Sequence, residues 1–218
     1  MENVFRSDSK LYQVVEKIVN LIKLNVIWML FCIPIITVGA ANTALHKVAL
    51  QILNGEEGNI VQSFYKEFRR NWKQKTIIWI PMFLIGIGIY LDMIFWQRIE
   101  GIMADTMKGF VLVLVILYFF LSVYIYPLIA YMNTNFRVTL RNAVLLAFKY
   151  LPKTIYMVVW LGIIWIVGKI WAIGLLLQLV AGASIVAFLH AVVLKKIFEK
   201  EGIIEQTTEE AKEEENIE

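Results

Sequence analysis

Three polar side chains lie within apolar stretches of this chain, where they could form a binding site. Asn42 and His46 are one helical turn apart, and Asn25 lies in the preceding apolar stretch. Because polar groups are costly inside a bilayer, such residues mark ligand sites or hydrogen-bonded contacts between helices. Pro34 separates the two stretches, and a turn there lets Asn25 face the other two residues. We favour a hydrogen-bond cluster that fastens two helices, with a ligand site as the alternative.

Two opposite charges also fall within apolar stretches. Asp92 and Lys169 each lie near the outer end of a predicted membrane helix. Charged groups at such depth pair with one another or mark an ion pathway. We predict an ion pair between them, with a structural role favoured over a pathway.

No catalytic constellation is visible among the remaining polar residues. The two histidines, His46 and His190, are not spaced with carboxylates as metal ligands, and the one cysteine, Cys32, has no partner. A phosphate-binding glycine loop and a nucleophile elbow are also missing from the sequence. We therefore expect no enzymatic activity, no metal and no cofactor. The basic residues flank apolar stretches, so a membrane surface explains them better than nucleic acid does.

Composition identifies the chain as a membrane protein. Its 218 residues are 59% hydrophobic, and the mean hydropathy is +0.66. Several uncharged runs reach the roughly 20 residues that a helix needs to cross a bilayer, and a continuous run satisfies its backbone only as a helix. We predict an all-α fold, a polytopic membrane helical bundle with about six membrane helices and two cytoplasmic-side amphipathic helices. The predicted membrane helices are 11–31, 38–54, 76–96, 110–132, 155–171 and 172–194, and the amphipathic ones are 60–75 and 133–153.

The distribution of lysine and arginine decides whether residues 38–54 cross the membrane. This stretch is the weakest span by hydropathy, and Thr37 is its predicted N-cap. Basic residues accumulate on the cytoplasmic side of membrane proteins. Six spans place the four large basic groups of the chain on one side, whereas five spans separate the first group from the second. We therefore predict six spans with the N-terminus and the C-terminus both cytoplasmic.

The predicted helix 60–75 has two chemically different faces. Ile60, Phe64, Phe68 and Trp72 recur every four residues, and cations occupy the other face. This pattern is typical of a helix that lies on a membrane, with aromatic rings at the acyl boundary and cations among anionic headgroups. The predicted basic face consists of Lys66, Arg69, Arg70 and Lys73.

The chain divides into a membrane domain and a tail. Residues 1–198 form a single integral membrane domain, and residues 199–218 carry a net charge of −7. Such an acidic segment is predicted to be a solvated, disordered cytoplasmic tail, or else a docking segment for a basic partner. Within the membrane domain, 38–96 and 116–171 form a possible parallel repeat of the kind found in some transporters.

Several short segments resemble the YesL family, a bacterial group of small integral membrane proteins. They are IPIITVGAA at 33–41, AL at 44–45, GEEG at 55–58, and the spaced residues Phe64, Phe68-Arg69 and Asn71-Trp72. The later segment YLPKT at 150–154 resembles that family's Asn-Leu-Pro-x-Thr segment, with Tyr150 in place of asparagine.

The resemblance implies a protein of the bacterial cytoplasmic membrane without established activity, often encoded beside carbohydrate ABC importers. It brings no catalytic residues. We expect an accessory or regulatory component of carbohydrate (ABC-type) uptake, whose partners are the lipid bilayer and the importer's membrane subunits. The alternative is a small secondary transporter with a midplane polar site at Asn42 and His46. A hydrated cavity lined by those residues would favour the transporter, and a dry bundle would exclude it.

Overall fold

The computed structural model describes residues 10–56, 58–132, 136–170 and 172–203, and these form helices and turns without a strand. This confirms the predicted all-α class, and most helix ends fall within a few residues of the predicted ones. The helices are α1 (Lys10–Phe31), α2 (Val38–Asn54), α3 (Ile60–Arg69), α4 (Trp72–Gln97), α5 (Ile102–Tyr131), α6 (Phe136–Lys149), α7 (Leu151–Ile170), α8 (Ala172–Leu177) and α9 (Ala183–Lys200), with a 3-10 turn at Ile35–Thr37 and a π-helical segment at Gln178–Gly182.

Four helical stretches in the described residues are long and apolar enough to cross a membrane. They are Trp72–Gln97, Ile102–Tyr131, Leu151–Ile170 and Ile173–Lys200, and they support a membrane-embedded protein. The first two predicted spans do not meet the same criteria. α2 has only 17 residues, fewer than the roughly 20 that a perpendicular crossing needs, and α1 carries polar and charged residues along its first half.

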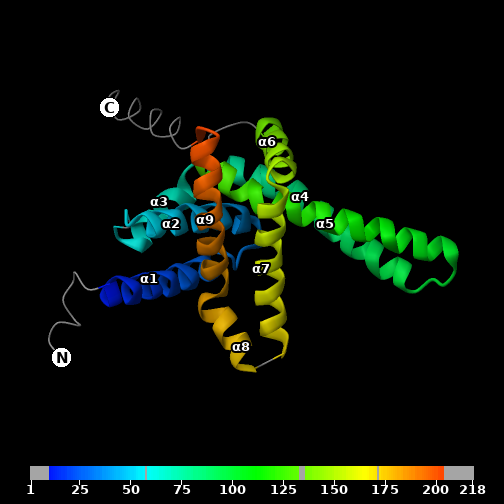
Figure 1. Cartoon of the computed structure of the whole chain (residues 1–218), viewed down its shortest axis with the longest axis horizontal. Helices are drawn as coiled ribbons and strands as arrows, with labels where there is room; N and C mark the ends of the chain where they lie inside the picture. Colours follow the sequence, from blue (N-terminus) through cyan, green and yellow to red (C-terminus); the bar gives the residue numbers. More distant parts are fainter. Residues whose placement is uncertain (1–9, 57, 133–135, 171, 204–218) are drawn as a thin grey trace.

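α2 is the central helix of the fold, and it packs against α1, α3, α4, α5 and α9 (Figure 1). Small residues on α2 allow its neighbours to approach closely. Gly39 lies against α4, where an added Cβ would be 2.4 Å from the Cβ of Trp79. The weak hydropathy of α2 therefore reflects a helix surrounded by protein rather than one exposed to lipid.

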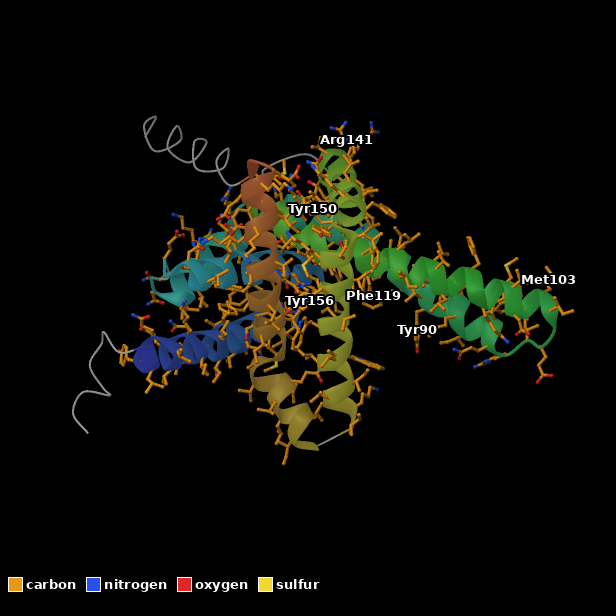
Figure 2. The ribbon with its side chains drawn as sticks, in the orientation of Figure 1. Tyr90, Met103, Phe119, Arg141, Tyr150 and Tyr156 are labelled. Atoms are coloured by element: carbon orange, nitrogen blue, oxygen red, sulfur yellow. The ribbon has the colours of Figure 1, made fainter. Side chains whose placement is uncertain are left out.

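Two apolar hairpins project from this centre in different directions (Figure 1). One consists of α4 and α5, with Met103 at its free end (Figure 2). The other runs through α7 and α8 into α9. Leucine, isoleucine and valine side chains cover the outer surfaces of both hairpins, as expected where lipid is the solvent.

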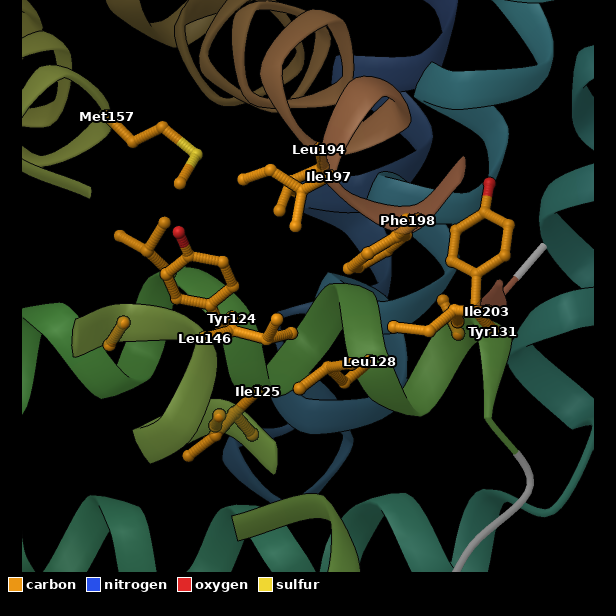
Figure 3. Close-up of a cluster of buried hydrophobic side chains, with 14 of the residues drawn as sticks. Tyr124, Ile125, Leu128, Tyr131, Leu146, Met157, Leu194, Ile197, Phe198 and Ile203 are labelled. Atoms are coloured by element: carbon orange, nitrogen blue, oxygen red, sulfur yellow. The ribbon is translucent and has the colours of Figure 1, made fainter. Parts of the chain in front are cut away.

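A buried apolar cluster joins the bases of the two hairpins (Figure 3). Tyr124 and Leu128 of α5 pack in it with Met157 of α7 and with Ile197 and Phe198 of α9. The hydroxyl of Tyr124 is 3.0 Å from that of Thr154 at the start of α7. This cluster fixes the two hairpins relative to each other.

The structure corrects the prediction for the helix 60–75. α3 ends at Arg69, and a new helix begins at Trp72 after Asn71, which adopts a left-handed conformation with φ 47°. Phe64 is fully buried, and its ring lies 5.4 Å from that of Phe31 in α1. The apolar face from Ile60 to Phe68 therefore packs on protein instead of lying at the acyl boundary, whereas Trp72 is exposed.

Thr37 is the N-cap residue of α2, as predicted, but it does not cap the helix with its side chain. Its side chain makes no capping hydrogen bond to that helix. The hydroxyl instead donates to the carbonyl oxygens of Phe31 and Pro34, each at 2.7 Å. Thr37 therefore stabilises the turn that ends α1, which is the turn predicted from Pro34.

The predicted tail boundary at residue 199 falls inside α9. Glu201 accepts hydrogen bonds from Lys149 and Tyr150, and Ile203 is buried in the apolar cluster. Residues 199–203 therefore belong to the folded body. The rest of the predicted tail, 204–218, lies outside the described residues.

The halves of the predicted repeat begin 78 residues apart, at 38 and 116, so Trp72 and Thr76 correspond to Tyr150 and Thr154. Matching local contacts occur at these positions. The hydroxyl of Thr76 donates to the carbonyl of Trp72 at 2.9 Å, and that of Thr154 donates to the carbonyl of Tyr150 at 3.1 Å. In both places an amphipathic helix ends and an apolar helix begins within a few residues. The repeat itself stays a prediction.

Gly39→Ala is expected to destabilise the protein. The new methyl group would meet the Trp79 side chain and the Lys75 carbonyl oxygen at 2.4 and 2.9 Å, and overpacking of this kind costs about 1–3 kcal/mol. Gly88→Ala is the matched control, because nothing lies within 4 Å of the added carbon there. Thermal unfolding in detergent should show a lower midpoint for Gly39→Ala only. Equal midpoints would show that α2 and α4 do not pack this closely.

Glu201→Gln tests the contact that holds the end of α9. Hydrogen bonds from Lys149 and Tyr150 hold the pKa of Glu201 below its ordinary value. The carboxylate therefore stabilises the fold at a pH above about 4.3, the ordinary pKa of a glutamate carboxyl. This contribution disappears as the pH falls through the lower pKa that Glu201 has in the folded protein. For so exposed a pair we expect about 0.2–1 kcal/mol. The difference in melting temperature between wild type and variant should be present at neutral pH and vanish in acid. A difference that persists in acid would contradict this.

Candidate functional site

A cavity of about 530 Å³ lies between α1, α2, α5, α7 and the α8–α9 unit. Its volume is within the usual range of ligand pockets, about 300–1,000 Å³. The three residues of the predicted polar cluster all line it, and they are joined by others that sequence reasoning did not group with them. The polar lining residues are Asn25, Asn42, His46, Ser122, Gln178 and His190, and the aromatic ones are Trp28, Tyr126 and Trp165.

Asn25 is buried and joins α1 to the π-helical segment. Its amide nitrogen donates to the carbonyl of Leu179 at 2.7 Å, and its amide oxygen accepts from the backbone N–H of Ser184 at 3.2 Å. Leu179 and Ser184 are five residues apart, the spacing that a π-helix connects. One side chain thus bonds both ends of a π turn. Asn25 therefore helps to hold the wall of the cavity in this irregular conformation.

Asn42 joins α2 to α1 by a hydrogen bond, as the favoured interpretation predicts, but its partner is Trp28 rather than Asn25. Its side-chain oxygen accepts a hydrogen bond from the indole N–H of Trp28 at 2.8 Å. Asn25 and Asn42 thus both connect α1 to the rest of the fold, but through separate partners. The three residues of the predicted cluster therefore line one cavity but do not hydrogen-bond to one another as a cluster. Each asparagine has its own partner.

His46 and His190 stack across the cavity wall, with ring centroids 6.0 Å apart and ring planes 7° from parallel. The Nε2 atom of His190 is 3.1 Å from the carbonyl oxygen of Met157. Because a carbonyl only accepts, this contact places the proton on Nε2 and leaves Nδ1 as an acceptor. Nδ1 is buried and has no hydrogen-bond partner among the described residues. Sequence reasoning had considered His190 only as a metal ligand.

Gln178 lies at the first position of the π segment and reaches across to α7. An added Cβ on Gly168 would be 1.7 Å from the side-chain oxygen of Gln178, so this amide packs directly on the α7 backbone. Both Gly168 and Gln178 can be read from the sequence, but only the fold shows that the glycine leaves room for the glutamine side chain.

The structure does not bring Asp92 and Lys169 together. Asp92 is exposed on the outer part of α4, and Lys169 is near the end of α7, with its Nζ 5.0 Å from the centre of the Trp165 ring. Among the described residues, no ion pair joins them. The two helices belong to hairpins that diverge (Figure 1), so their outer ends cannot meet.

The predicted basic face is exposed, although its helix is shorter than predicted. Lys66, Arg69, Arg70 and Lys73 all lie on the surface. Their neighbour Lys75 is instead buried, and its Nζ is 2.9 Å from a carboxylate oxygen of Glu67. The contact with anionic headgroups stays a prediction for the four exposed cations.

The cavity chemistry suits an uncharged ligand. Its described lining contains amides, imidazoles, hydroxyls and aromatic rings, and no acidic or basic side chain apart from the two histidines. Nor does the described part of the chain contain a group of three or more histidine, cysteine or acidic residues placed to hold a metal ion. A buried ion would find no counter-charge here, and its desolvation would be costly.

Asn25→Leu is expected to loosen the π segment, because the carbonyl of Leu179 and the N–H of Ser184 lose their side-chain partner. A buried backbone group left unpaired costs about 1–3 kcal/mol. Amide hydrogen exchange at residues 182–184 should become faster, while exchange in the middle of α5 stays unchanged. Asn25→Asp is the matched variant, since its carboxylate still accepts from Ser184 but cannot donate to Leu179. Unchanged exchange in both variants would show that Asn25 does not hold this turn.

Comparison with known proteins places part of the chain beside an uncharacterised family. Residues 21–93 match the model of a family described as "Protein of unknown function, DUF624". The match extends from α1 through most of α4, about a third of the chain, and it is consistent with the resemblance to the YesL family without confirming that name. Neither the curated proteins nor the solved structures that were compared contain a match to this chain.

Proposed function

We propose that this protein is a membrane-embedded carrier that binds an uncharged small molecule in the cavity described above. The observation that supports this most is a cavity of about 530 Å³ lined by neutral polar, aromatic and aliphatic side chains, within a protein built from membrane-type helices. A bundle held only by an interhelical hydrogen-bond cluster has no need of such a space. The cavity therefore favours a carrier over an accessory component of an importer.

We assign the ligand to the carbohydrate class. Amide and imidazole groups exchange hydrogen bonds with hydroxyls, and aromatic rings offer flat apolar faces to sugar rings. Asn42, His46 and Gln178 provide the first kind of group, and Trp28 and Tyr126 provide the second. The resemblance to a family encoded beside carbohydrate importers points to the same class.

An accessory role in ABC-type carbohydrate uptake is the second proposal. It is supported by α6, whose surface carries exposed apolar side chains, among them Val138, Leu145 and Phe148, beside the exposed cations Arg137 and Arg141. A mixed face of this kind fits the membrane subunits of an importer, and it fits a bilayer surface as well.

We further propose that the protein lies in a bacterial cytoplasmic membrane with both termini inside. Three basic groups, at 66–75, 137–153 and 195–200, lie near the joined bases of the two hairpins, while the hairpin tips carry few cations. Under the positive-inside rule, the bases would be cytoplasmic.

Counterflow of radiolabelled glucose and maltose in proteoliposomes tests the carrier proposal. Wild-type protein should exchange one of the two sugars, and His46→Leu should reduce the rate about tenfold, because a buried hydroxyl would lose a hydrogen-bond partner. His46→Gln should recover part of the rate, and Leu84→Gln on the lipid-facing surface of α4 is the control. No counterflow, with stoichiometric recovery of importer permease subunits from native membranes, would favour the accessory role instead.

A further inference from the structure

Two opposite charges on the outer parts of the hairpins have no ionic partner among the described residues. Asp92 of α4 and Lys169 of α7 are both exposed, and neither belongs to the ion pairs that this part of the chain forms. Lys108, a cation of the same hairpin as Asp92, pairs with Asp105 at 2.9 Å instead. The fold of one chain therefore leaves both charges available to a partner.

Each of these charges lies in an otherwise apolar helix surface. α4 and α7 are both long and apolar enough to cross a membrane. Exposed apolar side chains lie beside both charges, namely Leu91 and Phe95 on α4 and Ile166 and Ile170 on α7. Ionisable residues of membrane helices pair with one another or face protein rather than lipid. A lysine can extend its ammonium group toward the headgroups, but the short side chain of Asp92 has little such reach.

The two charges also lie at nearly the same distance from the joined bases of the hairpins. Ile78 of α4 and Met157 of α7 both belong to the buried cluster that joins these bases. Asp92 comes 14 residues after Ile78, and Lys169 comes 12 residues after Met157. At 1.5 Å per helical residue, the charges are about 21 and 18 Å along their helices from the cluster. They are therefore matched in level as well as opposite in sign.

A second copy of the chain can bring the two charges together, although one chain cannot. Within a chain, the hairpins diverge and keep Asp92 away from Lys169 (Figure 1). A twofold axis perpendicular to the membrane keeps every residue at its level and places α7 of one copy beside α4 of the other. In such a contact, each copy gives the other what it receives. Two ion pairs then form at once, and both charges of both copies are satisfied.

We propose that two copies of this chain associate side by side in the membrane, through ion pairs between Asp92 of each copy and Lys169 of the other. The opposite signs and the matched levels of the two charges identify a second copy as the partner. The inference is independent of the proposed function, because neither residue lines the cavity.

Co-purification of two differently tagged full-length chains tests this dimer. The chains are expressed together and extracted with a styrene–maleic acid polymer, which keeps the surrounding bilayer. Wild-type chains should co-purify. Asp92→Lys in both chains, or Lys169→Asp in both, places like charges at both contacts and should reduce co-purification about tenfold. Two contacts that each lose about 0.7 kcal/mol together lose the 1.4 kcal/mol that corresponds to this factor.

A mixed pair of variants makes the test specific to these two charges. A chain with Asp92→Lys is positive at both positions, and a chain with Lys169→Asp is negative at both, so both contacts between them again join opposite charges. This mixed pair should co-purify as wild type does, a recovery that two misfolded chains would not show. Glu100→Lys is the matched control, because it makes the same change of charge in the exposed turn between α4 and α5, and it should have no effect.

Three results would overturn the inference. The first is a wild-type chain that does not co-purify with a second copy, including one that recovers importer permease subunits in its place. The second is co-purification that Asp92→Lys and Lys169→Asp both leave unchanged. The third is a mixed pair that co-purifies no better than either variant does with itself.

Discussion

The close packing of α2 in the middle of the fold is the constraint on which the rest of the structure depends. Its backbone approaches α4 at Gly39, where even a methyl group would collide with Trp79. Because small residues let α1, α3, α4, α5 and α9 all contact this one helix, it can be short and polar without exposing polar groups to lipid. Thr43 bonds to the carbonyl of Gly39 at 2.8 Å, and Lys47 lies 3.9 Å from the centre of the Tyr131 ring.

Much of the fold could be predicted because its signals are local. The continuous apolar runs predicted the helices, and Pro34 predicted the end of α1, since proline disfavours a helical conformation in the residue before it. The signal is not absolute, because Pro81 and Pro127 lie inside α4 and α5. The prediction for 60–75 was wrong about what covers the apolar face. Periodicity shows that Phe64 and Phe68 share a face, but a bilayer and a protein surface both bury such a face equally well. Only the tertiary packing on Phe31 decides between them.

The cavity depends on contacts that local signals do not contain. The sequence indicates Asn25, Asn42 and His46, because polar groups are costly at membrane depth and occur there at sites or contacts between helices. The partners of Asn25 were not found, because Leu179 and Ser184 are more than 150 residues away. The partner of Asn42, Trp28, is only 14 residues away but gave no polar signal of its own. His190 gave no signal beyond being a histidine in an apolar helix. The predicted pairing of Asp92 with Lys169 assumed parallel spans, and the diverging hairpins separate these residues.

The irregular backbone and the cavity have a common cause. A regular helix from Ala172 to Lys200 would direct every backbone carbonyl along its own axis, and Asn25 would then have no backbone groups to bond. The π turn at Gln178–Gly182 widens the helix beside α1 and places Gln178 and Leu179 on the cavity lining. Such turns cost conformational stability and persist where other contacts compensate. Here the amide of Asn25 supplies that compensation, so one buried asparagine couples the attachment of α1 to the shape of the space in which a ligand would bind.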